Sequence, residues 1–442
     1  MPLLKKRLVM NREEALKLWA SKRQAGWQMT APQWLPPPIP HAESRSAPCG
    51  RAGSSRPSSA AADDQQNGNP ATPGLWGLTN AMTADGDHQA GNSASAGPQR
   101  HVLLTGGSSG IGLEAAQQLL EAGHRLTVLC RDAATADRLD QVLAEVAGQH
   151  LEGRLATPIC DLSDLTSVER CAEDLLTAAE PIESLVLNAG LQYSGASEPR
   201  WSAQGFELTI AVNHLAHQAL LQRLLPLLLQ GTTPRLVVTS SEVHDPSTAG
   251  GKVGQPAGLG DLAGLRQGPG AAMLDGGAFN AEKAYKDSKL CNLLMARELE
   301  RQLRQQGQSL PVLAWSPGLV IPRRSGGFFR YSRSENPFGQ ALFALVARDL
   351  LRLTETPARA GALLAGLATT SPTDPDGFQY WSNRVLGPGR LRFEASQPSV
   401  EARCDELARE LWTLTAQAAA NPGGDPGESP SADAAISGTV RS

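Results

Sequence analysis

The chain has 442 residues, a formal net charge of −4 and a hydrophobic fraction of 41%. That fraction suffices for a sizeable core, and the charge shows no basic footprint for nucleic acid or an anionic membrane surface. No apolar run approaches the length of a membrane span, and the N-terminus lacks the apolar stretch of a secretory signal. The composition therefore predicts a soluble protein without a nucleic-acid partner or a transmembrane segment.

The cysteines show no CxxC pairing and no metal-ligand spacing with histidine, and most fall inside apolar segments. We therefore expect reduced, buried thiols in a cytosolic-type compartment, with neither disulfides nor a metal site. The six are Cys49, Cys130, Cys160, Cys171, Cys291 and Cys404.

Residues 1–98 differ in composition from the rest. A basic, weakly amphipathic stretch at 3–19 is followed by Pro-, Ser-, Ala- and Gly-rich sequence without a period, which predicts a disordered extension. It could be a functional tail, an organelle-targeting segment, or upstream sequence of a mis-assigned start with Met82 as the initiator; we favour the last or a dispensable tail. Residues 420–442 are predicted to be a disordered tail as well.

From residue 101 apolar strands alternate with amphipathic helices, which predicts a doubly wound, parallel-sheet α/β fold of Rossmann type. Residues 99–419 are expected to form one catalytic domain with a C-terminal helical substrate region. Strands are predicted at 101–105, 125–130, 154–160, 183–188, 234–240 and 311–315. Helices are predicted at 110–122, 134–147, 164–179, 204–229, 281–306, 338–353, 357–368 and 399–418.

A glycine-rich turn, TGGSSGIG, joins the first strand to the first helix. Glycines there let the backbone turn tightly and approach a pyrophosphate, which the helix N-terminus favours. We therefore expect this turn to bind a dinucleotide. Its predicted contacts are Thr105, Gly106, Ser108, Ser109, Gly110, Ile111 and Gly112.

The residues after the second strand indicate which dinucleotide binds. An acidic residue at that strand end would bind a ribose 2′-hydroxyl, whereas an arginine accommodates a 2′-phosphate. Cys130 and Arg131 stand there, so we predict NADP(H), with a surface pair between Arg131 and Asp132 as the alternative.

Tyr285 and Lys289 stand four residues apart in a predicted helix and project from one face. A nearby ammonium favours a phenolate, so we expect Lys289 to lower the pKa of Tyr285 and make it a usable general acid or base. Ser241, at the end of a β-branched run, can hold a polar substrate group nearby. His214 and His217 are predicted to be packing or surface residues.

The order of glycine turn, strand-end Ser241 and YxxxK resembles the short-chain dehydrogenase/reductase family over residues 100–320. That resemblance implies an oxidoreductase, with Asn213 as a fourth catalytic residue that anchors a water near Lys289. The nicotinamide ribose would lie on Tyr285 and Lys289. The remaining cofactor contacts that it implies are Asp161, Leu162, Asn188, Ala189, Gly190, Pro317 and Gly318.

A long insert between Ser241 and Tyr285, the run AYKDSKLCN and a late YWSN resemble the light-dependent protochlorophyllide reductase branch over residues 100–415. This implies transfer of a hydride from NADPH to one carbon of a ring C=C bond and of a proton from Tyr285 to the other, without metal or flavin. Substrate contacts would come from Cys291, Gln192 and Tyr193. Leu187 and Leu319 replace cysteines of that branch, which leaves an altered substrate open.

Two other functions stay open: an NADPH-dependent carbonyl or alcohol oxidoreductase acting on a bulky apolar substrate, and an NADPH-sensing module without turnover. Helices 204–229 and 281–306 are expected to pair in a homo-oligomer. The two phenylalanines at 328–329 could touch a membrane surface peripherally. The compartment is predicted to be cytoplasmic, or stromal if the N-terminal extension is a targeting segment.

Overall fold

The computed structural model describes residues 99–147, 151, 153–321, 331, 334, 354–370 and 377–420, and all of them belong to one compact unit. The predictions for residues 1–98, for the helix at 338–353, for the pair at 328–329 and for the tail from 421 on lie outside the described residues.

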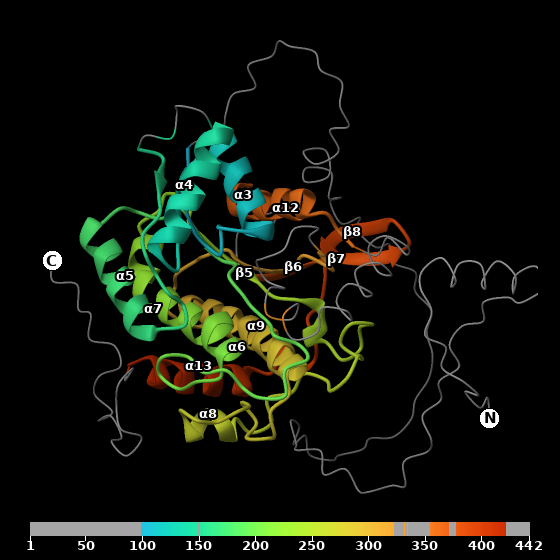
Figure 1. The fold of residues 1–442 in the computed structure, drawn as a ribbon. Coiled ribbons are helices and arrows are strands. Elements are labelled where there is room, and N and C mark those ends of the chain that lie inside the picture. Colours follow the sequence, from blue (N-terminus) through green and yellow to red (C-terminus); the bar gives the residue numbers. More distant parts are fainter. Residues whose placement is uncertain are drawn as a thin grey trace, which may run out of the picture. The chain divides into compact units, whose positions relative to one another are not determined.

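The described strands form one sheet of eight, in the order β3-β2-β1-β4-β5-β6-β7-β8 (Figure 1). Every pairing is parallel except that of β7 with β8. The predicted doubly wound α/β fold is confirmed. The strands are β1 (His101–Thr105), β2 (Arg125–Leu129), β3 (Leu155–Ala156), β4 (Ser184–Leu187), β5 (Arg235–Thr239), β6 (Val312–Ser316), β7 (Phe378–Gly387) and β8 (Arg390–Ala395).

Helices cover both faces of this sheet (Figure 1). One layer holds α3 (Gly110–Glu121), α4 (Ala133–Ala147) and α12 (Pro357–Thr369). The other holds α5 (Leu165–Ala178), α7 (Ala216–Leu229) and α9 (Ala281–Gln305), with α13 (Asp405–Ala420) outside them. Shorter elements are α6 (Leu208–Ile210), α8 (Ala263–Gln267), the π-helical turn η2 (Ala211–Leu215), and the 3₁₀ turns η3 (Glu242–His244) and η6 (Glu401–Arg403).

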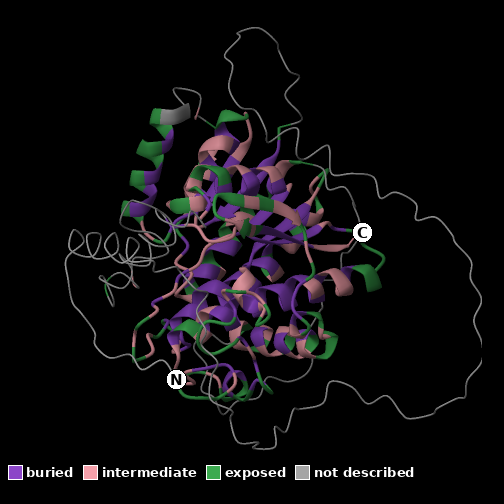
Figure 2. Cartoon of the chain, turned by 90° about the vertical axis from the view of Figure 1, so that its right-hand side faces the viewer, coloured by how far each residue is buried: buried purple, intermediate pink, exposed green. Residues whose placement is uncertain are grey.

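The core is divided in two by the sheet, because successive side chains of a strand point to opposite faces. Leu103 of β1 packs into the layer of α5, α7 and α9, whereas its neighbours Val102 and Leu104 pack into the layer of α3, α4 and α12. Figure 2 shows this buried interior with exposed residues on the outer helix faces.

The last two strands, β7 and β8, were not predicted, and β8 forms one edge of the sheet. In β7, Tyr380 and Trp381 stand side by side and break the alternation that marks a half-buried strand. β7 pairs in parallel with β6, and β8 pairs antiparallel with β7. The predicted strand at 154–160 is shorter than expected, since only 155–156 form a strand and Ile159 makes a single bridge to Cys130.

Helix α13 covers the two helices that were expected to pair in an oligomer. Its Leu411 and Thr415 are fully buried, the Trp412 carbonyl accepts from Gln218 of α7 at 2.8 Å, and Asp405 pairs with Arg297 of α9 at 2.8 Å. An oligomer through α7 and α9 would therefore have to use faces that α13 leaves uncovered.

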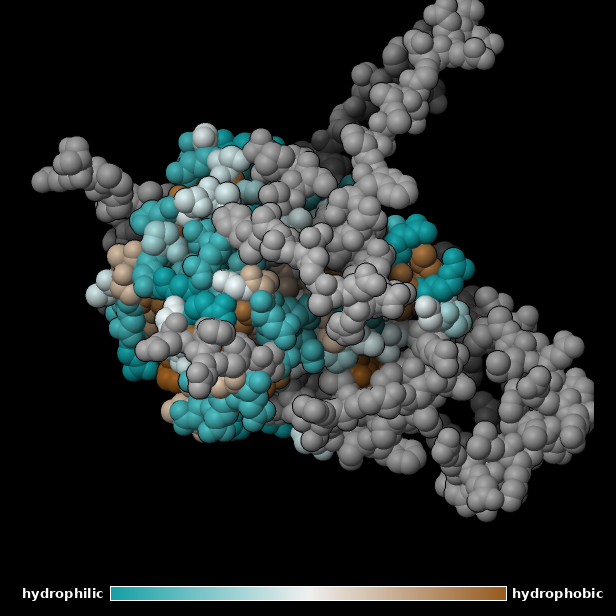
Figure 3. All heavy atoms as spheres, turned by 90° about the horizontal axis from the view of Figure 1, so that it is seen from above, coloured by the Kyte–Doolittle hydropathy of each residue, from teal (hydrophilic) through white to brown (hydrophobic). Residues whose placement is uncertain are grey.

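No helix within the described ranges is long and apolar enough to span a bilayer. The described surface seen in Figure 3 is mostly hydrophilic, with hydrophobic atoms in small areas.

Candidate active site

The glycine-rich turn leaves β1 at Thr105 and enters α3 at Gly110. Gly106 and Gly110 have φ of +70° and +57°, a region that glycine adopts freely. A Cβ on Gly112 would lie 2.1 Å from the Gly106 carbonyl oxygen, and one on Gly106 would lie 2.7 Å from the Ala189 Cα. The close approach that the turn needs therefore requires glycine at 106 and 112, and the N-terminus of α3 suits an anionic group.

The Thr105 hydroxyl joins the ends of β1 and β4. Its oxygen accepts from the backbone N–H groups of Asn188 and Ala189, each at 2.9 Å. The Asn188 amide in turn accepts from the Thr239 hydroxyl at 3.1 Å. The structure thus brings together Thr105, Asn188 and Ala189, which were predicted as cofactor contacts, at the carboxyl ends of three neighbouring strands, where ligands of such sheets bind.

A hollow of about 290 Å³ lies beside the glycine turn, at the end of β2. Arg131 lies there with its Nε 2.9 Å from Asp132, so the predicted alternative pair is present. Asp132 also accepts from the backbone and hydroxyl of Thr135 at the start of α4, and these bonds hold the pKa of its carboxyl down at about 2. The hollow is lined by Ser108, Ser109, Leu113, Arg131, Thr135, Arg138, Leu139 and Val142.

Arg138 was not predicted. It is the sixth residue of α4 and donates to the Thr135 hydroxyl at 3.1 Å. A helical residue seven positions after Arg131 carries no motif in the sequence, but the fold places both guanidinium groups on one hollow. Two cations and two serine hydroxyls fit a phosphate ester.

The predicted adenine-side residues follow β3. Asp161 accepts from the backbone and hydroxyl of Ser163 at 2.9 and 2.7 Å, and its own N–H donates to Ser167. Leu162 is half-buried and packs against the core. Their contact with adenine stays a prediction.

Helix α9 carries Tyr285 and Lys289 on one face, as predicted, and β5 delivers Ser241 to the same place. The Ser241 hydroxyl hydrogen-bonds the Tyr285 phenol, and the Lys289 Nζ lies 5.6 Å from the centroid of the Tyr285 ring. Lys289 donates to the Thr239 carbonyl at 3.2 Å, and a Cβ on Gly190 would lie 3.5 Å from its Nζ.

The pKa of Tyr285 shifts in the direction opposite to the prediction. Burial raises it, and the hydrogen bond from Ser241 opposes this only in part. Burial also lowers the pKa of Lys289 to about 8. Lys289 does not lower the phenol pKa as expected, and Tyr285 at neutral pH is a protonated phenol that is a weaker acid than free tyrosine. Its use as a proton donor depends on Ser241 and Lys289 stabilising the phenolate that forms.

Asn213 lies in the π-helical turn η2 and is fully buried. Its side-chain oxygen accepts from the Leu191 N–H at 2.8 Å, and its amide donates to the Leu191 carbonyl and to the Ser288 hydroxyl, each at 3.0 Å. The residue therefore ties the turn after β4 to the catalytic helix beside Lys289. The water that it is predicted to anchor stays a prediction.

Of the predicted substrate contacts, two are enclosed in the protein. Cys291 is a fully buried residue of α9, and burial raises the pKa of its thiol. Tyr193 is also fully buried; its hydroxyl bonds the buried carboxyl of Glu207, and its ring stacks on Phe279 at 5.8 Å. Gln192, by contrast, is half-buried. Substrate roles for all three stay predictions.

The predicted residues Pro317 and Gly318 follow β6 and are braced by the late YWSN run. Gly318 has φ of +76°, and a Cβ on it would lie 2.6 Å from the Asn383 carbonyl oxygen. The Asn383 amide donates to the Pro317 carbonyl at 3.3 Å and to Glu355 at 3.0 Å. Asn383 of the YWSN run thus holds the Pro317–Gly318 loop in place.

The long insert before Tyr285 is held down by α9 itself. The Lys286 Nζ donates to the carbonyls of Gly251, Val253 and Gln255 at 3.0, 2.5 and 2.8 Å. This organising role was not predicted, because three backbone carbonyls leave no trace in a sequence.

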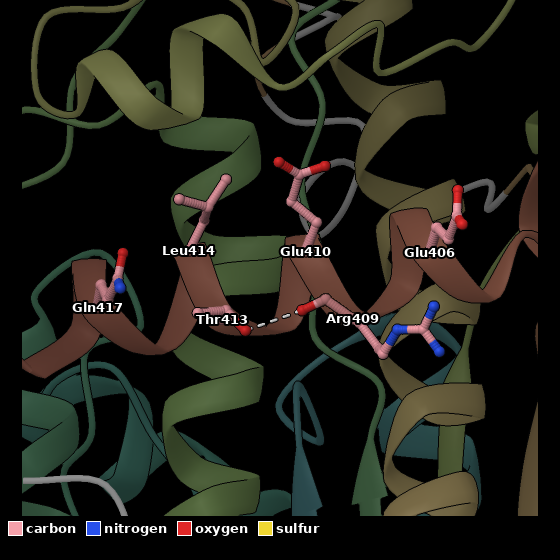
Figure 4. A pocket seen from close by; sticks show the side chains of 6 residues that line it. All are labelled: Glu406, Arg409, Glu410, Thr413, Leu414 and Gln417. Atoms are coloured by element: carbon pink, nitrogen blue, oxygen red, sulfur yellow. Dashed lines mark hydrogen bonds between the residues drawn. The ribbon is translucent and has the colours of Figure 1, made fainter. Parts of the chain in front are cut away.

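A second hollow, of about 410 Å³, lies along α13 (Figure 4). Its lining is charged or polar apart from Leu414, and Glu410 is paired with Arg266. None of the predicted site residues lines it, and its polarity does not suit an apolar substrate. The lining consists of Glu406, Arg409, Glu410, Thr413, Leu414 and Gln417.

Comparison with known proteins agrees with this geometry. A family model described as short chain dehydrogenase matches residues 100–253, and one described as a protein of unknown function matches residues 1–34. Protochlorophyllide reductase A of Oryza sativa subsp. japonica is 33% identical over 322 residues, 71% of this chain and 79% of its own. Protochlorophyllide reductase of Avena sativa is also 33% identical over 322 residues, with 97% of its length covered.

A solved structure of an uncharacterized protein from Mycobacterium paratuberculosis is similar over 73% of this chain and 94% of its own, with a TM-score of 0.50 and 26% identity. The relatives, the sheet order and the meeting of Ser241, Tyr285 and Lys289 agree with one another. The chain therefore belongs to the short-chain dehydrogenase family, is an oxidoreductase, and has protochlorophyllide reductases among its relatives.

Proposed function

We propose that this chain is an NADPH-dependent reductase that adds hydrogen across a ring C=C bond of protochlorophyllide or a closely related tetrapyrrole. The observation that carries the proposal is the buried, protonated Tyr285 beside Ser241 and Lys289, in a chain one-third identical to protochlorophyllide reductases. Residues 99–419 form the catalytic domain of this proposal.

The residues present fit a dinucleotide. Gly106 and Gly112 leave a close approach that a Cβ would fill, and the closeness of Gly190 to Lys289 supports a place for the nicotinamide end beyond the carboxyl ends of the strands. When bound, the reduced nicotinamide supplies the hydride for one carbon of the double bond.

Tyr285 gives its phenolic proton to the other carbon. The product then gains one hydride and one proton, which balances the reduction. Lys289 stabilises the phenolate that remains, because an adjacent ammonium favours that charge. Ser241 orients the phenol through the hydrogen bond it makes with it.

The preference for NADPH over NADH rests on Arg131 and Arg138. Substitution of either with alanine is expected to raise the KM for NADPH about tenfold or more, since each removes a charge-assisted bond of roughly 1.5–3 kcal/mol. The KM for NADH should stay within about twofold, because NADH lacks the 2′-phosphate. Steady-state kinetics with both cofactors measure this, and an equal rise for both would refute the assignment.

A second function is favoured by one observation. The hydroxyls of Ser241 and Tyr285 are joined in the arrangement that can hold and protonate a carbonyl oxygen, whereas Cys291 is enclosed in the core. The alternative is a light-independent reductase of a bulky apolar aldehyde or ketone. A non-catalytic NADPH sensor is not favoured, since a sensor needs no proton donor.

The deciding experiment records absorbance of the purified chain with NADPH and protochlorophyllide, in darkness and after a flash. Red-shifted product formed only after light would support the pigment reductase. Pigment that stays unbound and unconverted would overturn it, and NADPH oxidation in the dark with apolar aldehydes or ketones would then support the alternative. The plant relatives are named chloroplastic; for this chain a stromal-type or cytoplasmic compartment is proposed.

A further inference from the structure

His217 is fully buried on α7 and bonds at both ring nitrogens. Its Nδ1 lies 3.0 Å from the Asn213 carbonyl oxygen, and its Nε2 lies 3.0 Å from the Thr105 hydroxyl. A carbonyl oxygen can only accept, so Nδ1 carries the hydrogen. In the neutral ring Nε2 is then an acceptor, and the Thr105 hydroxyl donates to it.

Burial keeps this imidazole neutral. It lowers the pKa of His217 to about 3, and the charges of Lys289 and His214 act in the same direction. The ring therefore stays neutral across the pH range in which an enzyme works, so protonation does not break either hydrogen bond there.

The bond to Thr105 sets the direction of that hydroxyl. Within the described part of the chain, the other acceptor in reach of this hydroxyl, the Val186 carbonyl, lies farther away at 3.5 Å. With its proton on His217, the hydroxyl oxygen turns its lone pairs to the N–H groups of Asn188 and Ala189. His217 thereby fixes the turn that leads to Gly190.

The hydrogen bond from His217 to the Asn213 carbonyl fixes the η2 turn on the other side of the imidazole. The Ala216 N–H reaches back to the Ala211 carbonyl, five residues earlier, so the backbone is locally π-helical. Asn213 takes its side-chain partners from Leu191 and from Ser288, the neighbour of Lys289. One imidazole thus connects the cofactor turn to the catalytic helix.

We propose that His217 is a positioning residue that holds the 188–190 turn and Asn213 at a fixed separation, and so aligns the nicotinamide end of the dinucleotide with Lys289. The part that concerns NADPH rests on the proposed function. The role does not require His217 to touch substrate or to exchange a proton.

Two substitutions separate the two bonds. In His217→Asn the amide nitrogen can stay near the place of Nδ1, which keeps the Asn213 bond and loses the one to Thr105. In His217→Gln the amide oxygen can reach the place of Nε2, which keeps the Thr105 bond and loses the other. His214→Gln is the matched control, since His214 is buried on the adjacent turn but bonds Thr415 of α13.

NADPH binding is measured in darkness by fluorescence titration without pigment, and turnover and the thermal midpoint are measured separately. His217→Asn should weaken NADPH binding about tenfold, the loss of roughly one hydrogen bond. In the double variant with Thr105→Val, NADPH binding should be little weaker than in Thr105→Val alone, because both substitutions remove the same hydrogen bond. His217→Gln should keep NADPH affinity within about threefold and lower kcat about tenfold, while His214→Gln lowers the thermal midpoint without changing NADPH affinity.

Unchanged NADPH affinity in His217→Asn, or effects of His217→Asn and Thr105→Val that simply add, would overturn the proposal. The proposal would also be overturned if, across His217→Asn, His217→Gln and His214→Gln, the loss of NADPH affinity were simply proportional to the fall in the thermal midpoint. If the wild-type chain binds NADPH but converts no pigment, the proposed substrate fails and the binding measurements still decide the role of His217. A wild-type chain that does not bind NADPH would overturn both.

Discussion

Substitution of Tyr285 with phenylalanine is expected to lower the rate of pigment reduction by about 10²–10⁴-fold, the range that a positioned general acid contributes. The change removes one oxygen from a side chain that burial keeps protonated. The aromatic ring and its packing beside Lys289 stay, so NADPH affinity in darkness should remain within about twofold. Single-turnover absorbance after a flash measures the rate directly.

Tyr193→Phe is the comparison variant for this experiment. Tyr193 is also a buried phenol whose pKa is raised by burial, but its hydroxyl bonds Glu207 rather than Ser241. Its loss should reduce the free energy of unfolding, because it leaves the buried Glu207 with one partner fewer, and should leave the turnover rate near that of the wild type. A Tyr285→Phe rate within tenfold of the wild type would move the proton donor elsewhere, and a raised KM for pigment in Tyr193→Phe would support its predicted substrate contact.

The parts of the site that depend on residues close together in the sequence could be predicted from it. Gly106 adopts a φ of +70°, and a Cβ on Gly112 would meet the Gly106 carbonyl six residues earlier, so both needs are local. The Tyr285–Lys289 pair follows from one turn of helix. The parallel strands were visible because each is a short apolar run that the helices bury on both faces.

The remainder depends on contacts between distant segments. His217 was interpreted as a packing or surface residue, since a lone histidine on an apolar helix has no spacing signal, and its partner Thr105 lies 112 positions away. Arg138 becomes part of the cofactor hollow only when α4 lies against the end of β2. The sign of the Tyr285 pKa shift also depends on burial, which a residue pattern does not report.

Lys289→Met is expected to abolish most turnover and yet to stabilise the fold at neutral pH. Burial holds the Lys289 pKa at about 8, below the ordinary 10.5. Between pH 8 and pH 10.5 the unfolded chain binds more protons than the folded one, so the free energy of unfolding of the wild type rises with pH in that range. Below pH 8 Lys289 is charged in both states, and the folded state bears the whole cost of burying the ammonium. A shift of that size corresponds to ~3 kcal/mol.

Methionine removes this cost while filling similar space. Loss of the hydrogen bond from Lys289 to the Thr239 carbonyl destabilises the variant by about 1 kcal/mol. That carbonyl keeps its bond from Asn292 at 3.2 Å. The net gain in the free energy of unfolding should therefore be about 2 kcal/mol at pH 7. Urea unfolding at pH 7 and pH 10 measures it, and the advantage of the variant should shrink toward pH 10 as the wild-type lysine becomes neutral.

The matched control is Lys286→Met on the same helix. Lys286 donates to three backbone carbonyls of the insert, so its removal leaves three acceptors without that donor and should lower stability at both pH values. A stability difference for Lys289→Met that is the same at pH 7 and pH 10 would contradict the buried-ammonium argument. Opposite changes in the free energy of unfolding, a gain for Lys289→Met and a loss for Lys286→Met, would support the argument. They would mean that the fold bears the cost of a buried charge at Lys289 because the site requires that charge beside Tyr285.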